Sequence, residues 1–289
     1  MTVQCKKLNK GALWLVLGGA FVLRLLLAAI TTGYSYDMGC FGAWAAKMAQ
    51  TGPAAFYSDG YFVDYSPGYL YVLGAVGAVQ KIFELDFDGA AFKMLLALVP
   101  AVCDCAAAWL VAQLGQRCLP AGRGVLCLTA FAALHPAALF DTAVWKQIDG
   151  AFTLPILLCF LLLETKNYLP AAIFYGIALS IKPQALLFGP VLAACFLAGI
   201  VLERDRLRAF GRCFAGAALA VLPVLAAGLP FFGLRPHGAP AYAAQGGRVN
   251  ALPVAAQRRQ PVEGVDRCCF WRRCGGMISA CMRRRWDFR

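Results

Sequence analysis

Residues 11–31 read GALWLVLGGAFVLRLLLAAIT, a nearly unbroken apolar run. A helix of roughly 20 residues crosses the ~30 Å hydrocarbon core of a bilayer, and this run has that length. Similar runs recur almost to the end of the chain, at 69–83, 90–114, 124–140, 151–163, 169–181, 185–202 and 210–232. We therefore predict an all-α fold, a polytopic transmembrane helical bundle of about 7–9 membrane segments.

Composition excludes an ordinary soluble domain. Of the 289 residues 61% are hydrophobic and 15% charged, which is too apolar and too poor in charge for a water-soluble domain of this size. Lys6, Lys7 and Lys10 precede the first run, which is too long for a cleaved signal sequence, so we interpret it as an uncleaved anchor. The thirteen Cys show neither metal-ligand spacing nor a disulfide framework.

The basic loops predict which side each loop occupies, because Lys and Arg stay on the cytoplasmic side. Residues 203–208 and 117–123 carry Arg and are expected inside, which places 145–149 and 182–184 outside. Counting from the N-terminus places 33–65 outside as well. Residue 65 outside and residue 117 inside require an odd number of membrane crossings between them, whereas two apolar runs lie there. We therefore expect the run at 69–83 to be a half-helix that does not cross.

The chain changes character after residue 233. We assign 1–233 to the transmembrane domain and 234–289 to a tail that holds eleven Arg, no Lys and four Cys. One interpretation is a cytoplasmic tail that binds anionic lipid. The one we prefer is out-of-frame translation of GC-rich DNA, in which case the tail is disordered or artefactual and the native protein continues with further helices.

The first candidate functional residue is Asp37, which follows the first membrane segment at its outer end. Phe41, Trp44, Ala45 and Met48 then recur at i, i+3, i+4 and i+7, the pattern of an amphipathic helix lying on the outer membrane surface. Such a helix would hold Asp37 at a rim that lipid can reach. The alternative is an interfacial Asp without a chemical role.

Three further polar clusters fall on the same predicted outer face. The first surrounds Pro67, the second lies between two apolar runs at 141–150, and the third interrupts an apolar stretch of more than thirty residues. Ionisable side chains so near a bilayer are costly and are functional candidates by default. Interfacial anchoring or snorkelling is the alternative. The candidate substrate-binding residues are Asp64, Tyr65, Trp145, Gln147, Asp149, Lys182 and Gln184.

The ordered set of motifs resembles the bacterial branch of the C-type (GT-C) glycosyltransferases. The resemblance covers roughly residues 33–190 and is carried by F-x-x-W-A at 41–45, F-Y at 56–57, D-Y-S-P-G-Y at 64–69, H-P-A-x-L-F-D-T-A-V-W-K-Q-I-D at 135–149 and I-K-P-Q-A-L-L at 181–187. The family commonly has the motif Y-P-P-G where this chain reads Y-S-P-G, with Ser66 in place of Pro. It also has W-G-Q-x-D where this chain reads W-K-Q-I-D, with Lys146 in place of Gly. The lysine adds bulk and charge inside a presumed active-site motif, which would indicate a changed substrate or reduced activity.

The resemblance implies transfer of a hexose, mannose being one candidate, from a polyprenyl-phosphate donor to a glycan, lipid or protein acceptor on the extracytoplasmic face of the cell membrane. The family's catalytic base, an Asp in the first outer loop, matches Asp37. A carboxylate that takes the acceptor proton and a cation, Lys182, that holds the developing phosphate charge fit this chemistry. No nucleotide-type glycine-rich loop appears, and we expect no cofactor, metal or nucleic-acid partner. The alternatives are a non-enzymatic transporter or lipid carrier, or an inactive fragment of a glycosyltransferase.

Overall fold

The computed structural model describes residues 8–57, 63–119, 122–202 and 205–232, and within these ranges it contains helices and no β-strand. The α-helices are α1 (Lys10–Ile30), α2 (Ser35–Thr51), α3 (Pro67–Phe83), α4 (Ala90–Cys118), α5 (Gly122–Ala133), α6 (Pro136–Leu139), α7 (Asp149–Glu164), α8 (Tyr168–Ile181), α9 (Gly189–Leu202) and α10 (Arg206–Phe232). Two 3₁₀-helices, η1 (Pro53–Ala55) and η3 (Pro183–Phe188), and a π-helix, η2 (Phe140–Trp145), lie between them. The tail predicted at 234–289 lies outside the described residues.

All eight apolar runs form helices, which confirms the prediction of an all-α polytopic membrane bundle. Five stretches are long and apolar enough to cross a membrane: Lys10–Ile30, Ala90–Cys118, Gly122–Trp145, Pro183–Val201 and Arg206–Phe232. The other three runs correspond to α3, α7 and α8, which have 17, 16 and 14 residues. The stretch Gly122–Trp145 is one of these five, although it consists of α5, α6 and the π-helix η2.

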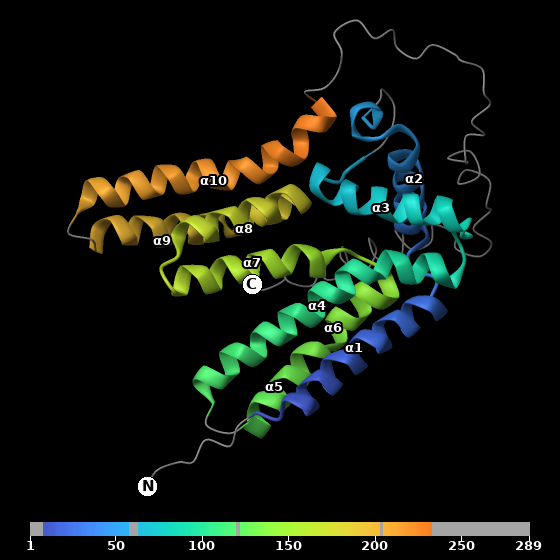
Figure 1. Cartoon of the computed structure of the whole chain (residues 1–289), viewed down its shortest axis with the longest axis horizontal. Helices are drawn as coiled ribbons and strands as arrows, with labels where there is room; N and C mark the ends of the chain where they lie inside the picture. Colours follow the sequence, from blue (N-terminus) through green and yellow to red (C-terminus); the bar gives the residue numbers. More distant parts are fainter. Residues whose placement is uncertain (1–7, 58–62, 120–121, 203–204, 233–289) are drawn as a thin grey trace, which may run out of the picture. The chain divides into compact units, whose positions relative to one another are not determined.

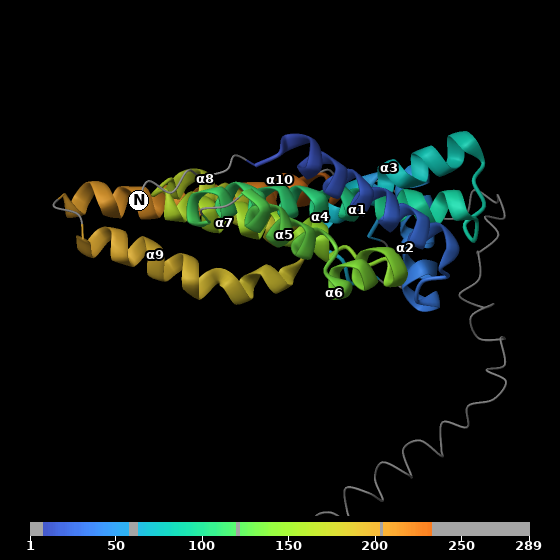
Figure 2. The ribbon, with the colours of Figure 1, turned by 90° about the horizontal axis from the view of Figure 1, so that it is seen from below.

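The long helix α4 connects two groups of helices (Figure 1). It packs against α1 and α5 on one side and against α7 on the other, and α7 in turn contacts α8, which packs along α10. Small and branched apolar side chains fill the contact of α1, α4 and α5, among them Leu17, Ala108 and Val125. In Figure 2, α9 lies to one side of α8 and α10, and it contacts η3, α10 and, through the rings of Phe196 and Tyr168, α8.

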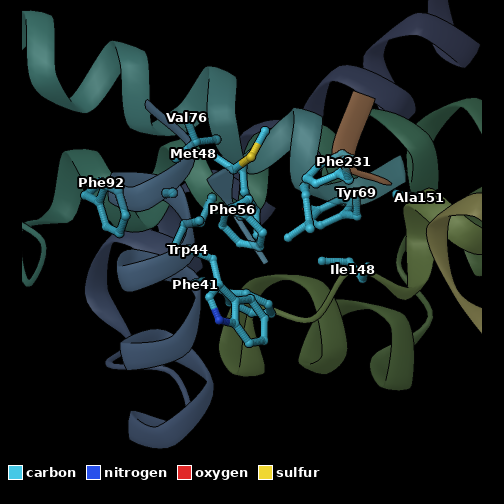
Figure 3. Close-up of a cluster of buried hydrophobic side chains, with 14 residues drawn as sticks. Phe41, Trp44, Met48, Phe56, Tyr69, Val76, Phe92, Ile148, Ala151 and Phe231 are labelled. Carbon is cyan, nitrogen blue, oxygen red and sulfur yellow. The ribbon is translucent and has the colours of Figure 1, made fainter. Parts of the chain in front are cut away.

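The amphipathic helix predicted after the first segment is α2, and its apolar stripe is buried, although not against the membrane surface as we predicted. Phe41, Trp44, Ala45 and Met48 are all less than 8% exposed. Protein covers the stripe, because α2 packs along α3 and these side chains join a core with residues of α4 and α10. Figure 3 shows this core, in which Phe41, Trp44 and Met48 lie near Tyr69 and Phe231. The packing fixes α2, and therefore Asp37 in its first turn, against the body of the protein.

Two glycines allow neighbouring helices to approach backbone to backbone. A Cβ at Gly77 of α3 would overlap the carbonyl oxygen of Ala45 in α2, and one at Gly176 of α8 would overlap the carbonyl oxygen of Ala220 in α10. Small residues at such crossings are typical of membrane helix packing. These contacts hold α2 against α3 and α8 against α10.

Candidate active site

A cavity of about 600 Å³ opens where the first turn of α2, the segment before α3, the segment before α7 and the break between α8 and η3 meet. Its lining comprises Asp37, Asp64, Tyr65, Gln147, Ile181, Lys182, Pro183, Gln184, Leu186 and Leu187. Six of the eight candidate residues named from the sequence therefore share one cavity, although they are spread over almost 150 positions. We call this the polar cavity. The other two candidates, Trp145 and Asp149, contact members of it.

Asp37 is held by two neutral donors. Its Oδ2 accepts hydrogen bonds from the side-chain amide of Gln147 and, at 3.2 Å, from the indole Nε1 of Trp145. Within the described part of the chain, no Lys or Arg forms an ion pair with Asp37, and Oδ1 receives no hydrogen bond. Asp37 also lies in the first turn of α2, where the helix dipole favours a negative charge. The arrangement orients a carboxylate without neutralising it.

Gln147 connects Asp37 to a tyrosine on the opposite wall. Its Oε1 accepts a hydrogen bond of 3.2 Å from the Tyr65 hydroxyl, so both ends of the amide are engaged. The Tyr65 ring packs edge-on against Phe41, with centroids 5.5 Å apart, and also contacts Trp44. Burial raises the pKa of Tyr65, and the charges of Asp149, Asp37 and Asp64 raise it further. Tyr65 therefore stays a neutral donor.

The cation of the cavity is Lys182, which occupies the break between α8 and η3. Pro183 follows it and favours the extended backbone that Lys182 adopts, which ends α8 at this point. Its ammonium forms an ion pair with Asp149 at the start of α7. The Lys182 side chain is 16% exposed and the Asp149 side chain 44%, so water and ligands reach this pair.

Negative charge dominates the described lining of the cavity. Asp37 and Asp64 line it, and Asp149 stands beside Lys182. The same field acts on Cys40, one turn after Asp37: burial raises the pKa of its thiol, and Asp64 and Asp37 raise it further. A phosphate entering this cavity would thus depend on Lys182 for attraction. No group of three or more His, Cys, Asp or Glu in the described ranges is arranged to hold a metal ion.

Trp145 and Gln147 reach Asp37 because the preceding turn is a π-helix. η2 runs from Phe140 to Trp145 and ends at Lys146, whose backbone has a left-handed conformation with φ +68°. π-Turns occur often at functional sites, because the extra residue redirects the side chains that follow. Here Trp145 and Gln147 point toward Asp37, whereas the Lys146 side chain is 2% exposed and does not line the cavity. The expected bulk and charge of Lys146 therefore lie outside the cavity.

A buried polar network beneath η2 was not predicted from the sequence. Asp104 of α4 accepts hydrogen bonds from Arg24 of α1 at 3.0 Å and from Thr142 of η2 at 2.6 Å. Arg24 is fully buried and also donates to the carbonyl oxygen of Ala133 at 2.7 Å. A signal was available: one Arg and one Asp, each inside an apolar run, are rare enough in membrane segments to be paired with each other. The network ties η2 to two spanning helices.

A second cavity, of about 620 Å³, adjoins the first. It lies between α8, α9 and α10, and its lining is mostly apolar, with Leu179, Leu192 and Val221 among the residues. Pro183 and Leu186 of η3 line both cavities, so the same short helix separates a polar chamber from an apolar one. We call the second chamber the apolar groove. The pair suits a ligand with a polar head and a hydrocarbon tail.

Comparison with known proteins places the chain in a family. Its sequence matches the profile of glycosyltransferase family 87 over residues 62–253, which is more than half of the chain and includes every residue of the polar cavity's lining except Asp37. Neither a curated protein nor a solved structure matches it. Together with the membrane-spanning helices, the match supports a membrane glycosyltransferase with a sugar donor and an acceptor. The chain belongs to glycosyltransferase family 87.

Proposed function

We propose that this enzyme transfers a hexose, with mannose as the first candidate, from a polyprenyl-phosphate donor to an acceptor hydroxyl, with Asp37 as general base. The observation that carries the proposal is the state of Asp37, a carboxylate in the cavity that is oriented by Gln147 and Trp145 and has no cationic partner among the described residues. A carboxylate paired with a cation would be a weaker base, because the cation stabilises its charged form.

The proposed step is a displacement at the anomeric carbon. Asp37 takes the proton of the acceptor hydroxyl, the acceptor oxygen forms a bond to the anomeric carbon, and the bond from that carbon to the phosphate oxygen breaks. The bonding electrons leave with the phosphate, which gains negative charge. Positioned donors stabilise such charge most where water is excluded. Lys182 is placed to do so and would exchange part of its contact with Asp149 for the phosphate.

The two adjoining cavities support a lipid-linked donor. The polar cavity holds the carboxylates and Lys182, and the apolar groove begins on the other side of Pro183 and Leu186. A polyprenyl phosphate has a charged head and a long hydrocarbon chain, so it matches this division. Asp64, Tyr65, Gln147 and Gln184 would then contact sugar or acceptor, because they line the polar cavity.

The test is sugar transfer in membranes that contain the full chain. Radiolabelled polyprenyl-phosphate mannose and glucose are compared with the corresponding nucleotide sugars as donors. We expect transfer from a lipid donor and a loss of about 10²–10⁴-fold in Asp37→Asn, the range of general-base catalysis. Asp88→Asn is the matched control, because Asp88 is exposed and does not line the cavity.

Two results would contradict the proposal. Full activity of Asp37→Asn would remove Asp37 from the mechanism. Absence of transfer from any donor by correctly folded protein would favour a non-enzymatic carrier or an inactive protein.

The proposed extracytoplasmic side has its own test. Gln147→Cys and Gln184→Cys place a thiol on the cavity lining, at positions expected outside from the distribution of basic loops. A membrane-impermeant maleimide should label both in intact cells. Labelling that requires membrane disruption would move the active site to the cytoplasmic face.

A further inference from the structure

Lys146 occupies a position that is unusual for lysine. It lies between Trp145 and Gln147, the two residues that hold Asp37, and its backbone is left-handed, with φ +68° and ψ 35°. This conformation suits glycine and costs other residues on the order of 1 kcal/mol. The backbone is thus strained at the residue between the two that hold Asp37.

The side chain ends in a cage of oxygen atoms. Its Nζ donates to Thr31 Oγ1 at 2.8 Å, to the Thr31 carbonyl at 3.0 Å, and to the carbonyls of Ala143 and Val144 at 3.3 and 3.4 Å. Thr31 Oγ1 donates in turn to the carbonyls of Leu27 and Ala143. All four acceptors are neutral, and no described carboxylate forms an ion pair with Lys146. The ammonium is thus bound by the carbonyl ends of two helices, α1 and η2, where helix dipoles favour a cation.

The cage joins the two segments that must meet for Asp37 to be held. α1 ends at Ile30, Thr31 is its C-cap, and Asp37 follows six residues after Thr31. On the other side, η2 ends at Trp145 and Gln147 comes directly after Lys146. The stem of Lys146 fits against Gly33, because a Cβ at Gly33 would lie 3.2 Å from its Cδ. The ammonium therefore contacts both segments within a few residues of the Asp37 hydrogen bonds.

We propose that Lys146 is a positioning residue, which fixes the end of α1 against η2 and thereby holds Asp37 in register with Trp145 and Gln147. The inference rests on the proposed role of Asp37. Lys146 does not line the polar cavity, so it acts through these neighbours and not on the substrate. In catalysis a displacement of about 1 Å can lower the rate about 10²-fold.

The experiment compares Lys146→Met and Lys146→Gly with wild type in detergent and in vesicles. Met keeps the bulk and removes the charge, whereas Gly relaxes the left-handed backbone and removes the contact altogether. We expect both to lower kcat per folded molecule by about 10–100-fold. The KM for the donor should stay unchanged, since Lys182 and Gln184 are untouched. Lys81→Met, the same change at an exposed lysine on α3, is the control and should leave kcat unaltered.

A double-mutant cycle separates positioning from general stability. Thr31→Val removes the hydroxyl that the ammonium contacts. This substitution should therefore lower kcat in the wild-type background and have little further effect in Lys146→Met. The melting temperature of Lys146→Met should not fall, because the substitution removes a buried charge.

Each outcome has one meaning. The inference requires that Asp37→Asn is inactive. Given that, it would be overturned if Lys146→Met had the wild-type kcat per folded molecule, or if Lys146→Gly alone were fully active. If wild type transfers no sugar, or Asp37→Asn stays active, the proposed function itself has failed. Fewer folded molecules with unchanged kcat would make Lys146 a structural residue only.

Discussion

The polar cavity and the buried network beneath η2 use the same kinds of side chain for different ends. In the network, Arg24 is fully buried and its partner Asp104 binds both Arg24 and Thr142. In the cavity, Asp149 is 44% exposed beside Lys182, and the described residues that hold Asp37 are neutral donors. A buried charge paired with a protein group contributes to structure, and a charge that a ligand can reach is available for chemistry. Substitutions in the network should therefore lower stability, and substitutions in the cavity should lower activity.

The largest effect is expected in the network. Asp104→Ala leaves the Arg24 guanidinium buried without its carboxylate, and removing one partner of a buried pair costs about 3–5 kcal/mol of unfolding free energy. Thermal unfolding in detergent measures the loss, with Asp88→Ala as the exposed control.

The double variant Arg24→Met, Asp104→Leu should recover most of that stability, because apolar residues can replace a buried ion pair. If Asp104→Ala were stable but had a lower kcat, the network would not have the purely structural role that distinguishes it from the cavity.

Lys182→Met should behave in the opposite way. Removing one group that stabilises developing charge costs about 10²–10³-fold in kcat. Stability should change by less than about 1 kcal/mol, because water can solvate the exposed Asp149 that remains. Initial rates with a saturating lipid donor, normalised to folded protein, measure the effect. An unchanged kcat would mean that Lys182 does not stabilise the charge on the leaving phosphate.

Lys146 belongs to neither region and gives a pH dependence of its own. Burial lowers its pKa from 10.5 to about 8, and the nearby Lys93 contributes to this shift. Between these values the unfolded chain binds a proton that the folded protein has released, so stability rises with pH across that window, and below it this group gives stability no pH dependence. The rise should be on the order of 2 kcal/mol. Chemical denaturation at pH 7.5 and pH 10 should show it in wild type and not in Lys146→Met; equal slopes would contradict the assignment.

The smallest expected effect is that of Tyr65→Phe. It removes the hydroxyl that donates to Gln147, a hydrogen bond worth about 1 kcal/mol, so transfer should fall by up to about tenfold. Tyr34→Phe is the control, since Tyr34 is exposed and contacts Trp145 through its ring. Equal activities of the two variants would mean that Gln147 needs no help from Tyr65.

The helices were predictable because a bilayer leaves few options for an apolar run of twenty residues. The gathering of Asp37, Gln147 and Lys182 was also anticipated, from the expectation that their loops share one face. Two features were not. The π-turn of η2 depends on the network below it, which involves helices far apart in sequence, and the direction of the Lys146 side chain depends on a left-handed backbone that no local pattern revealed.

Gly77 and Gly176 have a consequence for mutational scanning of this enzyme. Because any side chain at either position would overlap a carbonyl oxygen of the neighbouring helix, even alanine should be poorly tolerated there. A screen that scores loss of activity would rank these two positions beside Asp37, although neither carries a reactive group. The amount of folded protein in each variant would separate a lost reaction from a lost helix contact.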